Sequence, residues 1–475
     1  MLEGLARRHQ NDIQQLTKIH TLLVTTGYLT DVKNFRPPTS VYNILIKSCI
    51  HQKNPSPTAA AAAKLSVHLF NQMLATHTPP SAHTFPSLIK ASVTTGDHQL
   101  GLIIHGQVLR RGFHGDSFIG CCLLKLYSEL GQLPNARKVF DEMGVHDSAP
   151  CNAMLDAFLK NGEVESAVDL FGGGLAARDI VSWTTMVNGF VRNDLGKEAL
   201  WWFRKMMEEK GRRNDGSLRP NESTIVCGLS ACVSSKKSGD LGHGREIHGY
   251  VFRHEFEATA ILSTALVDMY GKCGYLKPAR NVFNLVEKKK RKIYIWNSMI
   301  SGLACNGEEK EALEVFKRMV MVENFKPNGI TFVAILTACA RARLVECGLK
   351  WFKSMSSEFG IQPTMEHYGC VVHLLGRAGL MGEAIELIKK MPFEADASVL
   401  GALLGACKVH GDVSLANQVG NLLLELQPLH SGRYMVLSNI YAAAGMWVDA
   451  TQLKQTMENR GIKKTMGYSL CANMT

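Results

Sequence analysis

The stretch IVSWTTMVNGFVRNDLGKEALWWFRKMMEEK (residues 180–210) decides the fold. Two apolar stripes recur in it near the three- and four-residue spacing of a helix face: Val181, Trp183, Met186, Val187 and Phe190, then Ala199, Leu200, Phe203 and Met206. The stripes meet at Gly196. They predict two amphipathic helices packed against each other, where the small alanine allows close approach and the phenylalanine four positions later fills the seam.

This signature, a small residue followed four positions later by an apolar residue or histidine, recurs along the chain. The pairs are Leu16/His20, Ser66/Phe70, Gly101/His105, Ala136/Phe140, Ala167/Phe171, Ala199/Phe203, Gly244/His248, Ala279/Phe283, Ala312/Phe316, Gly348/Phe352 and Ala384/Ile388; Ala416 and Ala450 keep only the small residue. From Ser66 onward the steps are about 31 to 36 residues, apart from one of about 45. A fixed period in this range indicates stacked supersecondary units.

The expected fold is therefore all-α, a right-handed α-solenoid superhelix of stacked helix-turn-helix repeats. No strand-like alternation of any length interrupts the helical pattern. Two polar or alanine-rich insertions, EEKGRRNDGSLRPN (208–221) and KNPSPTAAAAAK (53–64), lengthen individual units. Insertions of this kind are expected in surface turns.

Composition narrows the classes of partner. Hydrophobic residues make up 46% and charged residues 20% of the chain, enough for a large core. A formal net charge of +11 favours a polyanion such as nucleic acid. Of the 13 cysteines, four recur in the same helical context and are expected to be reduced packing residues: Cys49, Cys232, Cys339 and Cys407.

The termini and apolar segments bear on location. No apolar run approaches the length that crosses a bilayer, so no membrane partner is expected. The first twenty residues lack the continuous apolar segment of a secretory signal. They contain Arg7 and Arg8 and few acids, which fits a weak organellar presequence.

The sequence contains none of the common catalytic motifs: no Gly-x-x-x-x-Gly-Lys loop, no Gly-x-Ser-x-Gly elbow and no His-Glu-x-x-His. His20, His105 and His248 share one register and are expected to pack between helices, because catalysis needs side chains that converge on one point. His367 and Cys370 alone make a poor zinc site. We therefore expect no catalytic residue, no metal, no cofactor, no small-molecule substrate and no enzymatic activity.

The run Lys288–Lys292 could mimic a nuclear localisation signal. The period of the repeats instead places it between two units. We expect it to be a solvated turn with access to phosphate.

Motif details select one repeat family. Several first helices begin with an aromatic and a small polar residue: Tyr42-Asn43, Trp183-Thr184 and Trp296-Asn297. Other units contain LLKLYSELGQLPNARKVFDEM (123–143), LVDMYGKCGYLKPARNVF (266–283) and MEHYGCVVHLLGRAGLMGEAIELIKKMPFEAD (365–396). The chain resembles the pentatricopeptide repeat proteins of land plants, in the class that alternates standard, long and short repeats. The segments 400–428 and 432–464 resemble the two C-terminal extension motifs of that class.

The resemblance implies four parts. They are an N-terminal segment with a partial long-type repeat (1–38), the repeat array (39–396), the two extension motifs (397–466) and a short tail (467–475). Leu400 departs from the tryptophan usual in the first extension motif, and TMGYSLCANMT departs from the usual continuation. A zinc deaminase domain follows in some relatives and needs His-x-Glu and Cys-x-x-Cys. Neither motif occurs in this sequence.

In this family the fifth and the last residue of a repeat together read one RNA base. Carried over, Asn43 with Ser81 implies C, Asn152 with Asp179 implies U, Thr184 with Asn221 implies A, and Asn297 with Asn328 implies C with U tolerated. Thr264 implies a purine, although Lys292 departs from the pattern. Cys121 with Asp147 and Gly369 with Asp396 give no reading. The long-type repeats carry apolar fifth residues, Pro86, Val226 and Val333. The implied target, from 5′ to 3′, is C-n-n-U-A-n-R-Y-n-n.

The extension motifs accompany site-specific C-to-U editing of organellar transcripts in the family. The resemblance thus implies a site-recognition factor that binds single-stranded organellar RNA. A deaminase-bearing pentatricopeptide repeat protein and other editing factors would act in trans. The mitochondrion is favoured over the chloroplast. Two alternatives stay open: an RNA splicing or stability factor, and a protein-binding helical-repeat scaffold, whose affinity would lack the steep salt dependence of RNA binding.

Overall fold

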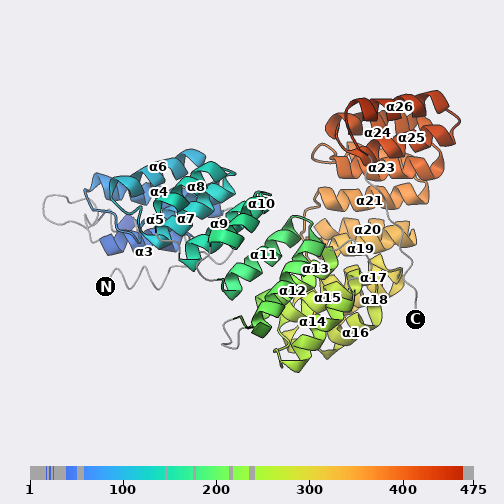
Figure 1. Ribbon diagram of the computed structural model, residues 1–475. Helices are drawn as coiled ribbons and strands as arrows, with labels where there is room; N and C mark the ends of the chain where they lie inside the picture. Colours follow the sequence, from blue (N-terminus) through green and yellow to red (C-terminus); the bar gives the residue numbers. More distant parts are fainter. Residues whose placement is uncertain are drawn as a thin grey trace. The chain divides into compact units, whose positions relative to one another are not determined.

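The computed structural model describes residues 39–50, 58–144, 147–174, 178–212, 218–234 and 241–463, with four single positions between 18 and 25. These residues form 24 α-helices and no strand (Figure 1), so the all-α prediction is confirmed. Apart from the four single positions, the predicted N-terminal segment lies outside the described residues, as does the predicted tail. The chain divides into two compact units, Met1–Cys227 and Gly228–Thr475.

The first unit is a stack of helical hairpins, each with a first and a second helix. The first helices are α3 (Thr39–Ile50), α5 (Phe85–Thr95), α7 (Ser117–Glu129), α9 (Ser148–Lys160) and α11 (Ile180–Arg192). The second helices are α4 (Thr58–Ala75), α6 (His98–Arg110), α8 (Leu133–Glu142), α10 (Val164–Asp169), which continues into the π-helical turn η1 (Leu170–Gly174), and α12 (Gly196–Arg212). Consecutive first helices contact one another from α3 through α11.

The second unit repeats this arrangement. Its division from the first falls within α13 (Glu222–Ser234). The helices that follow are α14 (Leu241–Arg253), α15 (Ala260–Lys272), α16 (Leu276–Leu285), η2 (Lys288–Lys290), α17 (Ile293–Cys305), α18 (Glu309–Lys317), η3 (Arg318–Val322), α19 (Gly329–Ala342), α20 (Val345–Ser357), α21 (Met365–Ala378), α22 (Met381–Lys389), α23 (Ala397–His410), α24 (Val413–Leu426), α25 (Ser431–Ala443) and α26 (Trp447–Asn459). The odd-numbered helices from α15 to α25 contact one another in sequence.

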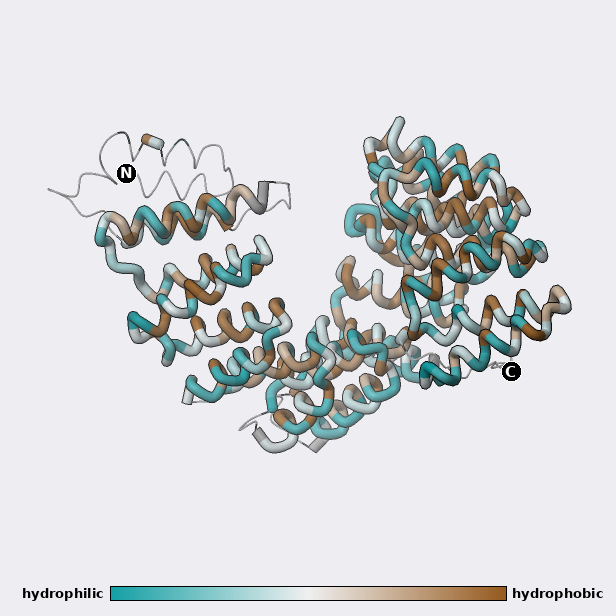
Figure 2. The backbone as a smooth tube through the Cα atoms, turned by 90° about the horizontal axis from the view of Figure 1, so that it is seen from above, coloured by the Kyte–Doolittle hydropathy of each residue, from teal (hydrophilic) through white to brown (hydrophobic). Residues whose placement is uncertain are grey.

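The small residue of the repeat signature lies in the seam between helices. Every described member is buried: Ser66, Gly101, Ala136, Ala167, Ala199, Gly244, Ala279, Ala312, Gly348, Ala384, Ala416 and Ala450. A Cβ on Gly348 would lie 2.3 Å from Leu374 Cδ2, which shows how close the approach is. Hydrophobic and hydrophilic residues alternate along individual helices (Figure 2), as amphipathic packing requires.

Three local predictions were wrong. The apolar stripe predicted for α11 includes Val181, but its side chain is 51% exposed, because it lies on the helix face of Thr184 and not on that of the buried Trp183. Residues 58–64, predicted as a surface turn, form the start of α4, since a run of alanines has the highest helix propensity. Residues 211 and 212, predicted to lie in a turn, extend α12 beyond the predicted helical stretch 180–210. Part of each insertion is therefore helical and lengthens α4 or α12.

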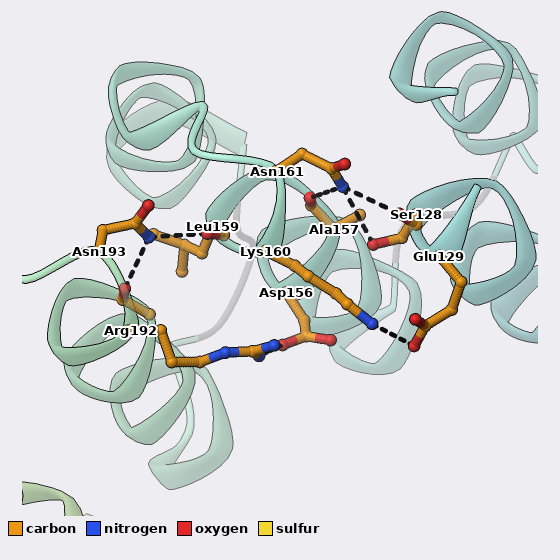
Figure 3. Close-up of polar contacts among 10 residues, drawn as sticks. Ser128, Glu129, Asp156, Ala157, Leu159, Lys160, Asn161, Arg192 and Asn193 are labelled. Carbon is orange, nitrogen blue, oxygen red and sulfur yellow. Dashed lines mark hydrogen bonds and ion pairs between the residues drawn. The ribbon is translucent and has the colours of Figure 1, made fainter. Parts of the chain in front are cut away.

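An asparagine just after a first helix joins successive repeats. Asn161 Nδ2 donates to the carbonyl of Ala157 in its own helix at 2.8 Å and to the carbonyl of Ser128 in the preceding first helix at 3.1 Å (Figure 3). Asn193 repeats this contact with Leu159, and Asn306 repeats it with Gly271, both at 2.7 Å. These carbonyls lie in or just before the last turn of a first helix and also accept a backbone N–H, so the asparagine amide adds a second hydrogen bond to each.

The same register continues with a different residue in the second unit. His410 is the last residue of α23 and precedes a left-handed glycine, as Asn161 does, and its Nε2 lies 2.8 Å from the carbonyl oxygen of Gly376 in α21. Ion pairs reinforce the junctions in the first unit: Lys160 pairs with Glu129, and Arg192 lies 3.4 Å from Asp156 (Figure 3). At these junctions the repeats are thus joined by polar contacts as well as by apolar packing.

Candidate nucleic-acid interface

The fifth and last residues of the repeats lie at the junctions between successive first helices. Most of the predicted last residues occupy the N-cap of the following first helix: Asp147 for α9, Asp179 for α11, Lys292 for α17, Asn328 for α19 and Asp396 for α23. The fifth residue lies just over one helical turn inside the preceding first helix. The fold therefore produces one such junction per repeat.

Three of the predicted pairs are joined directly. Asn43 Nδ2 donates to Ser81 Oγ at 2.9 Å, and Asn297 Nδ2 donates to Asn328 Oδ1 at 3.1 Å. Asn152 Nδ2 donates to Asp179 Oδ1 at 3.3 Å. In each case the two side chains come from sequence positions about 30 to 40 residues apart and meet only because the hairpins stack.

The fourth pair is joined through a third residue. Thr184 Oγ1 lies 2.8 Å from Thr224 Oγ1, and Thr224 Oγ1 donates to Asn221 Oδ1 at 2.9 Å. Thr184 Oγ1 also lies 2.7 Å from the carbonyl oxygen of Ile180 in its own helix, so its single hydrogen goes either to that carbonyl or to Thr224. Thr184 and Asn221 thus belong to one hydrogen-bonded set.

The other three predicted pairs engage different partners. Thr264 donates to the carbonyl of Ala260 at 2.6 Å, while Lys292 is exposed. Asp396 accepts from the backbone N–H groups of Ser398 and Val399, and its partner position, Gly369, has no side chain. In neither of these two pairs is a hydrogen bond recorded between the fifth and the last residue.

The remaining pair consists of the half-buried thiol of Cys121 and the exposed carboxylate of Asp147. Burial raises the pKa of Cys121, so this side chain stays a neutral thiol at physiological pH. Asp147 lies exposed at the N-cap of α9. This pair, too, gives no reading.

The Asp179 carboxylate is stabilised in its charged form. Partial burial raises its pKa, but hydrogen bonds from the Ser182 N–H and hydroxyl, from Asn152 and from the Val181 N–H outweigh burial, and the net pKa is lowered. Asp179 therefore caps α11 and presents an acceptor to Asn152 at the same time. Helix capping and the fifth–last contact are compatible roles of one residue.

A set of exposed apolar side chains accompanies these pairs and was not predicted from sequence. The second residue of many first-helix units is apolar and more than half exposed: Phe118, Val181, Ile261, Tyr294 and Ile330. Each lies three positions before a fifth residue and so on the same face of its helix. Counting from the N-cap would have found them, because an apolar residue two positions after a cap has no packing role there.

In the first unit, three lysines lie beside the fifth and second residues of the first helices. Lys47, Lys90 and Lys125 are exposed and share one groove with Asn43 and Phe118. Each is the ninth residue of its unit. None of the three forms an ion pair with another residue in the described part of the chain. The face thus combines donors, acceptors, flat apolar surfaces and positive charge, which suits a linear anionic polymer with planar groups.

Histidine packing is confirmed where the structure describes it. His105 Nδ1 lies 2.7 Å from Tyr127 Oη, and His248 Nδ1 lies 2.9 Å from Tyr270 Oη. Burial lowers the pKa of both imidazoles. His20 lies outside the described residues. His367 is buried and its Nδ1 lies 2.7 Å from Thr364 Oγ1 at the start of α21, so it serves a helix cap.

The cysteines of the repeated helical context are buried, as predicted. Burial raises the pKa of Cys49 to about 12 and that of Cys407 to about 11. Cys232 and Cys339 are also buried. These side chains act as small apolar packing groups.

The basic run 288–292 differs from the prediction at one residue. Arg291 is only 5% exposed. Its guanidinium lies 2.9 Å from Glu323 and over the ring of Phe283. A planar guanidinium can stack on an aromatic ring while bonding a carboxylate, which explains the burial. The three lysines before it are exposed, as expected.

Among the described residues, no three or more His, Cys, Asp or Glu side chains gather as a metal site would require. No helix in the same part of the chain is long and apolar enough to span a membrane.

Stacked helical hairpins with one side-chain set per junction define an α-solenoid repeat protein. Family models match as follows: the pentatricopeptide repeat at 121–147, 150–173, 181–210 and 366–394, the PPR repeat family at 291–341, the pentatricopeptide repeat domain at 320–378, and the E motif at 410–471. The Arabidopsis thaliana pentatricopeptide repeat-containing protein At1g10330 is 42% identical, across 98% of this chain and 96% of its own length. The chain belongs to the pentatricopeptide repeat family.

A second curated protein and a solved structure are also similar to the chain. The Arabidopsis thaliana pentatricopeptide repeat-containing protein At1g06140, whose name calls it mitochondrial, is 32% identical over 80% of this chain and 78% of its own length. The crystal structure of the maize pentatricopeptide repeat protein PPR10 aligns with 98% of this chain and 74% of its own, with 15% identity and a TM-score of 0.47. The repeats and the E motif fit the E-type class that the sequence predicted.

Proposed function

We propose that this protein binds a specific single-stranded RNA, one base per repeat, and performs no reaction of its own. The observation that carries the proposal is the repeated junction at which a fifth and a last residue share hydrogen bonds across successive first helices. A base can meet each junction by its edge, while the exposed second residues offer surfaces for stacking and the lysines meet phosphate.

The E motif supports a narrower role. We infer that the bound RNA is an organellar transcript and that the protein marks a site of C-to-U editing a few nucleotides 3′ of its footprint. The deaminase would be supplied in trans by another pentatricopeptide repeat protein, together with other editing factors. The mitochondrion is the favoured compartment, since a relative carries that location in its name.

The proposal gives a target sequence, C-n-n-U-A-n-R-Y-n-n. The direct test compares two short RNAs at one stated salt concentration, one with this sequence and one with its U and A exchanged. We expect the first to bind at least tenfold more tightly, because two base contacts change at once and each contributes about 1–3 kcal/mol of discrimination. Equal binding of both RNAs would refute the mapping.

A code exchange makes the test independent of overall affinity. The double variant Asn152→Thr/Asp179→Asn recreates the Thr184/Asn221 pair at the fourth base. It should prefer A over U at that base and keep A at the fifth. The control exchanges the tenth base, opposite Gly369, which should change the affinity of neither protein. A double variant that still prefers U would contradict the assignment.

The editing role has its own readout. In plants that lack this protein, an organellar C a few nucleotides 3′ of a matching sequence should remain unedited, and the wild-type gene should restore editing. Retained introns or shortened transcripts, with editing unchanged, would assign the RNA-binding activity to splicing or stability instead. Affinity without sequence preference or salt dependence would point to a protein-binding scaffold.

A further inference from the structure

A third side chain belongs to the junctions that discriminate. The residue three positions after the last residue is the third residue of the next repeat. It carries a hydroxyl in the four readable pairs: Thr84, Ser182, Thr224 and Thr331. The three unread or irregular pairs have Pro150, Ile295 and Val399 at that position, and the long-type repeats are followed by Ile119, Leu262 and His367. A residue with a hydroxyl group therefore occupies this position at every junction where the fifth and last residues are linked by hydrogen bonds.

At the first junction this hydroxyl alone orients the base-reading amide. Thr84 Oγ1 accepts from the Ser81 N–H at 3.0 Å, and it donates its only hydrogen to Asn43 Oδ1 at 2.6 Å. The other side of the Asn43 amide donates to Ser81 Oγ, a hydroxyl that can rotate to donate or accept. Thr84 is thus what distinguishes the oxygen end of Asn43 from its nitrogen end.

At the Asn297 junction the orientation is held twice. Asn328 Oδ1 accepts from the Thr331 N–H at 3.0 Å and from Asn297 Nδ2 at 3.1 Å, which fills both of its lone pairs. The Thr331 hydroxyl, 2.7 Å from Asn297 Oδ1, therefore gives its hydrogen to Asn297. Here the backbone N–H of Thr331, acting through Asn328, and the hydroxyl of Thr331 fix the same amide.

The Asn152 junction lacks this contact. The Ser182 hydroxyl donates to Asp179 Oδ1 at 2.7 Å. Asn152 Oδ1 is buried and accepts no hydrogen bond from the described residues. Its amide is oriented by the acceptor-only carboxylate of Asp179, which requires the NH₂ group. The Ser182 hydroxyl therefore bonds to the helix-capping residue Asp179 and makes no hydrogen bond to the fifth residue, Asn152.

We propose that the third residue of the following repeat is a positioning residue for base selection, acting by fixing which end of the fifth-residue amide faces the RNA. The proposal rests on the proposed RNA-binding function. An asparagine amide offers donors at one end and an acceptor at the other. If it turns over, the donor and acceptor presented to the base exchange places, and preference for one base is lost while the contact area is unchanged.

The test measures a ratio of affinities at one base. RNAs with C or A at the first position of the target are titrated against the wild-type chain, Thr84→Val and Thr84→Ser. Valine keeps the shape of threonine without the hydroxyl. We expect Thr84→Val to lower the C-over-A ratio by about two- to twelvefold, the equivalent of one net hydrogen bond, and Thr84→Ser to preserve it. Thr331→Val should lower the ratio at the eighth base by less, because Asn328 still holds Asn297.

Two comparisons separate positioning from a structural role. In Thr84→Val the preference for U-A over A-U at the fourth and fifth bases must stay at its wild-type value, since a general loss of folding would reduce both. Ser182→Ala, which removes a hydroxyl that contacts only Asp179, should leave base selection at the fourth position unchanged. An equal loss in Ser182→Ala would show that the hydroxyl acts through the helix cap, and the proposal would be overturned.

The outcomes also separate this inference from the function it rests on. If the wild-type chain does not distinguish C from A at the first base and U from A at the fourth, the assignment of bases to repeats is wrong. The proposed RNA recognition and the positioning role are then both refuted. If the wild-type chain discriminates and Thr84→Val and Thr331→Val discriminate equally well, RNA recognition stands and the positioning role is refuted. If Thr84→Val does not fold, by loss of helical circular dichroism, Thr331→Val in the second unit decides.

Discussion

Replacing Asn161 with alanine tests whether the polar contacts between repeats stabilise the stack. The variant removes one amide that donates to two helix-terminal carbonyls, those of Ala157 and Ser128, at 2.8 and 3.1 Å. Each such hydrogen bond contributes about 0.5–1.5 kcal/mol net. Asn161→Ala should therefore cost about 1–3 kcal/mol, a large effect for a half-buried surface residue.

The loss should be local. In a repeat array each unit contacts only its neighbours, so a weakened junction opens nearby helices first. Hydrogen–deuterium exchange of the full-length chain should show faster exchange in peptides from α7 and α9, by about tenfold for each 1.4 kcal/mol. Peptides from α21 to α26, in the other unit, should exchange at the wild-type rate.

A matched control uses another asparagine of the same unit. Asn188 is exposed on α11, and Asn188→Ala should change stability by no more than about 0.5 kcal/mol. The reasoning would be refuted if Asn161→Ala exchanged like the wild type. It would also be refuted if protection fell equally in all repeats, because the contact would then not act between neighbours.

Two further predictions concern protonation and close packing. The folded-state pKa of His105 is lowered by burial, so its contribution to the free energy of unfolding is present above the unfolded pKa of about 6.5 and is lost as pH falls below it. Urea midpoints measured from pH 7.5 to 5.5 should therefore fall less steeply in His105→Phe than in the wild type, and identical slopes would contradict this. In Gly376→Ala the new Cβ would lie 2.5 Å from Ala406 Cβ, and this variant should be destabilised by about 1–3 kcal/mol. Gly405→Ala, with no atom within 4 Å of its Cβ, should be neutral or slightly stabilising, so a thermal melt that ranks the two in the opposite order would refute the close approach of α21 and α23.

Much of the site was accessible from sequence because the register is rigid. Once the period was known, counting placed Asn43, Asn152 and Asn297 at equivalent points, and the structure shows each in contact with its predicted partner. Counting did not reveal the role of Thr84 or Thr331, because each also has a local role at the start of its own helix: Thr84 is the N-cap of α5, and Thr331 forms a capping box with Asn328. Whether its hydroxyl also reaches the preceding repeat depends on how two helices stack.

The burial of one residue and the exposure of another differ from the prediction made from the sequence. The burial of Arg291 is not predicted, because a run of cations is usually solvated. In the structure its guanidinium contacts Glu323 and lies over the rings of Phe283 and Trp296. The exposure of Val181 was missed because helical spacing alone does not say where a stripe ends. For Arg291 the deciding neighbour Glu323 is distant in sequence, whereas for Val181 counting from the N-cap Asp179 would have sufficed.

The sequence by itself determined the helix class, the period and the buried small residue of each unit, because these follow from local spacing of about four residues and from steric size. Tertiary structure decided which polar atoms meet. Hydrogen bonds depend on donor–acceptor distances within a few tenths of an ångström, and those distances are set by the packing of one hairpin on the next. The partners of Asn43, Asn161 and Arg291 were therefore visible only once the repeats were stacked.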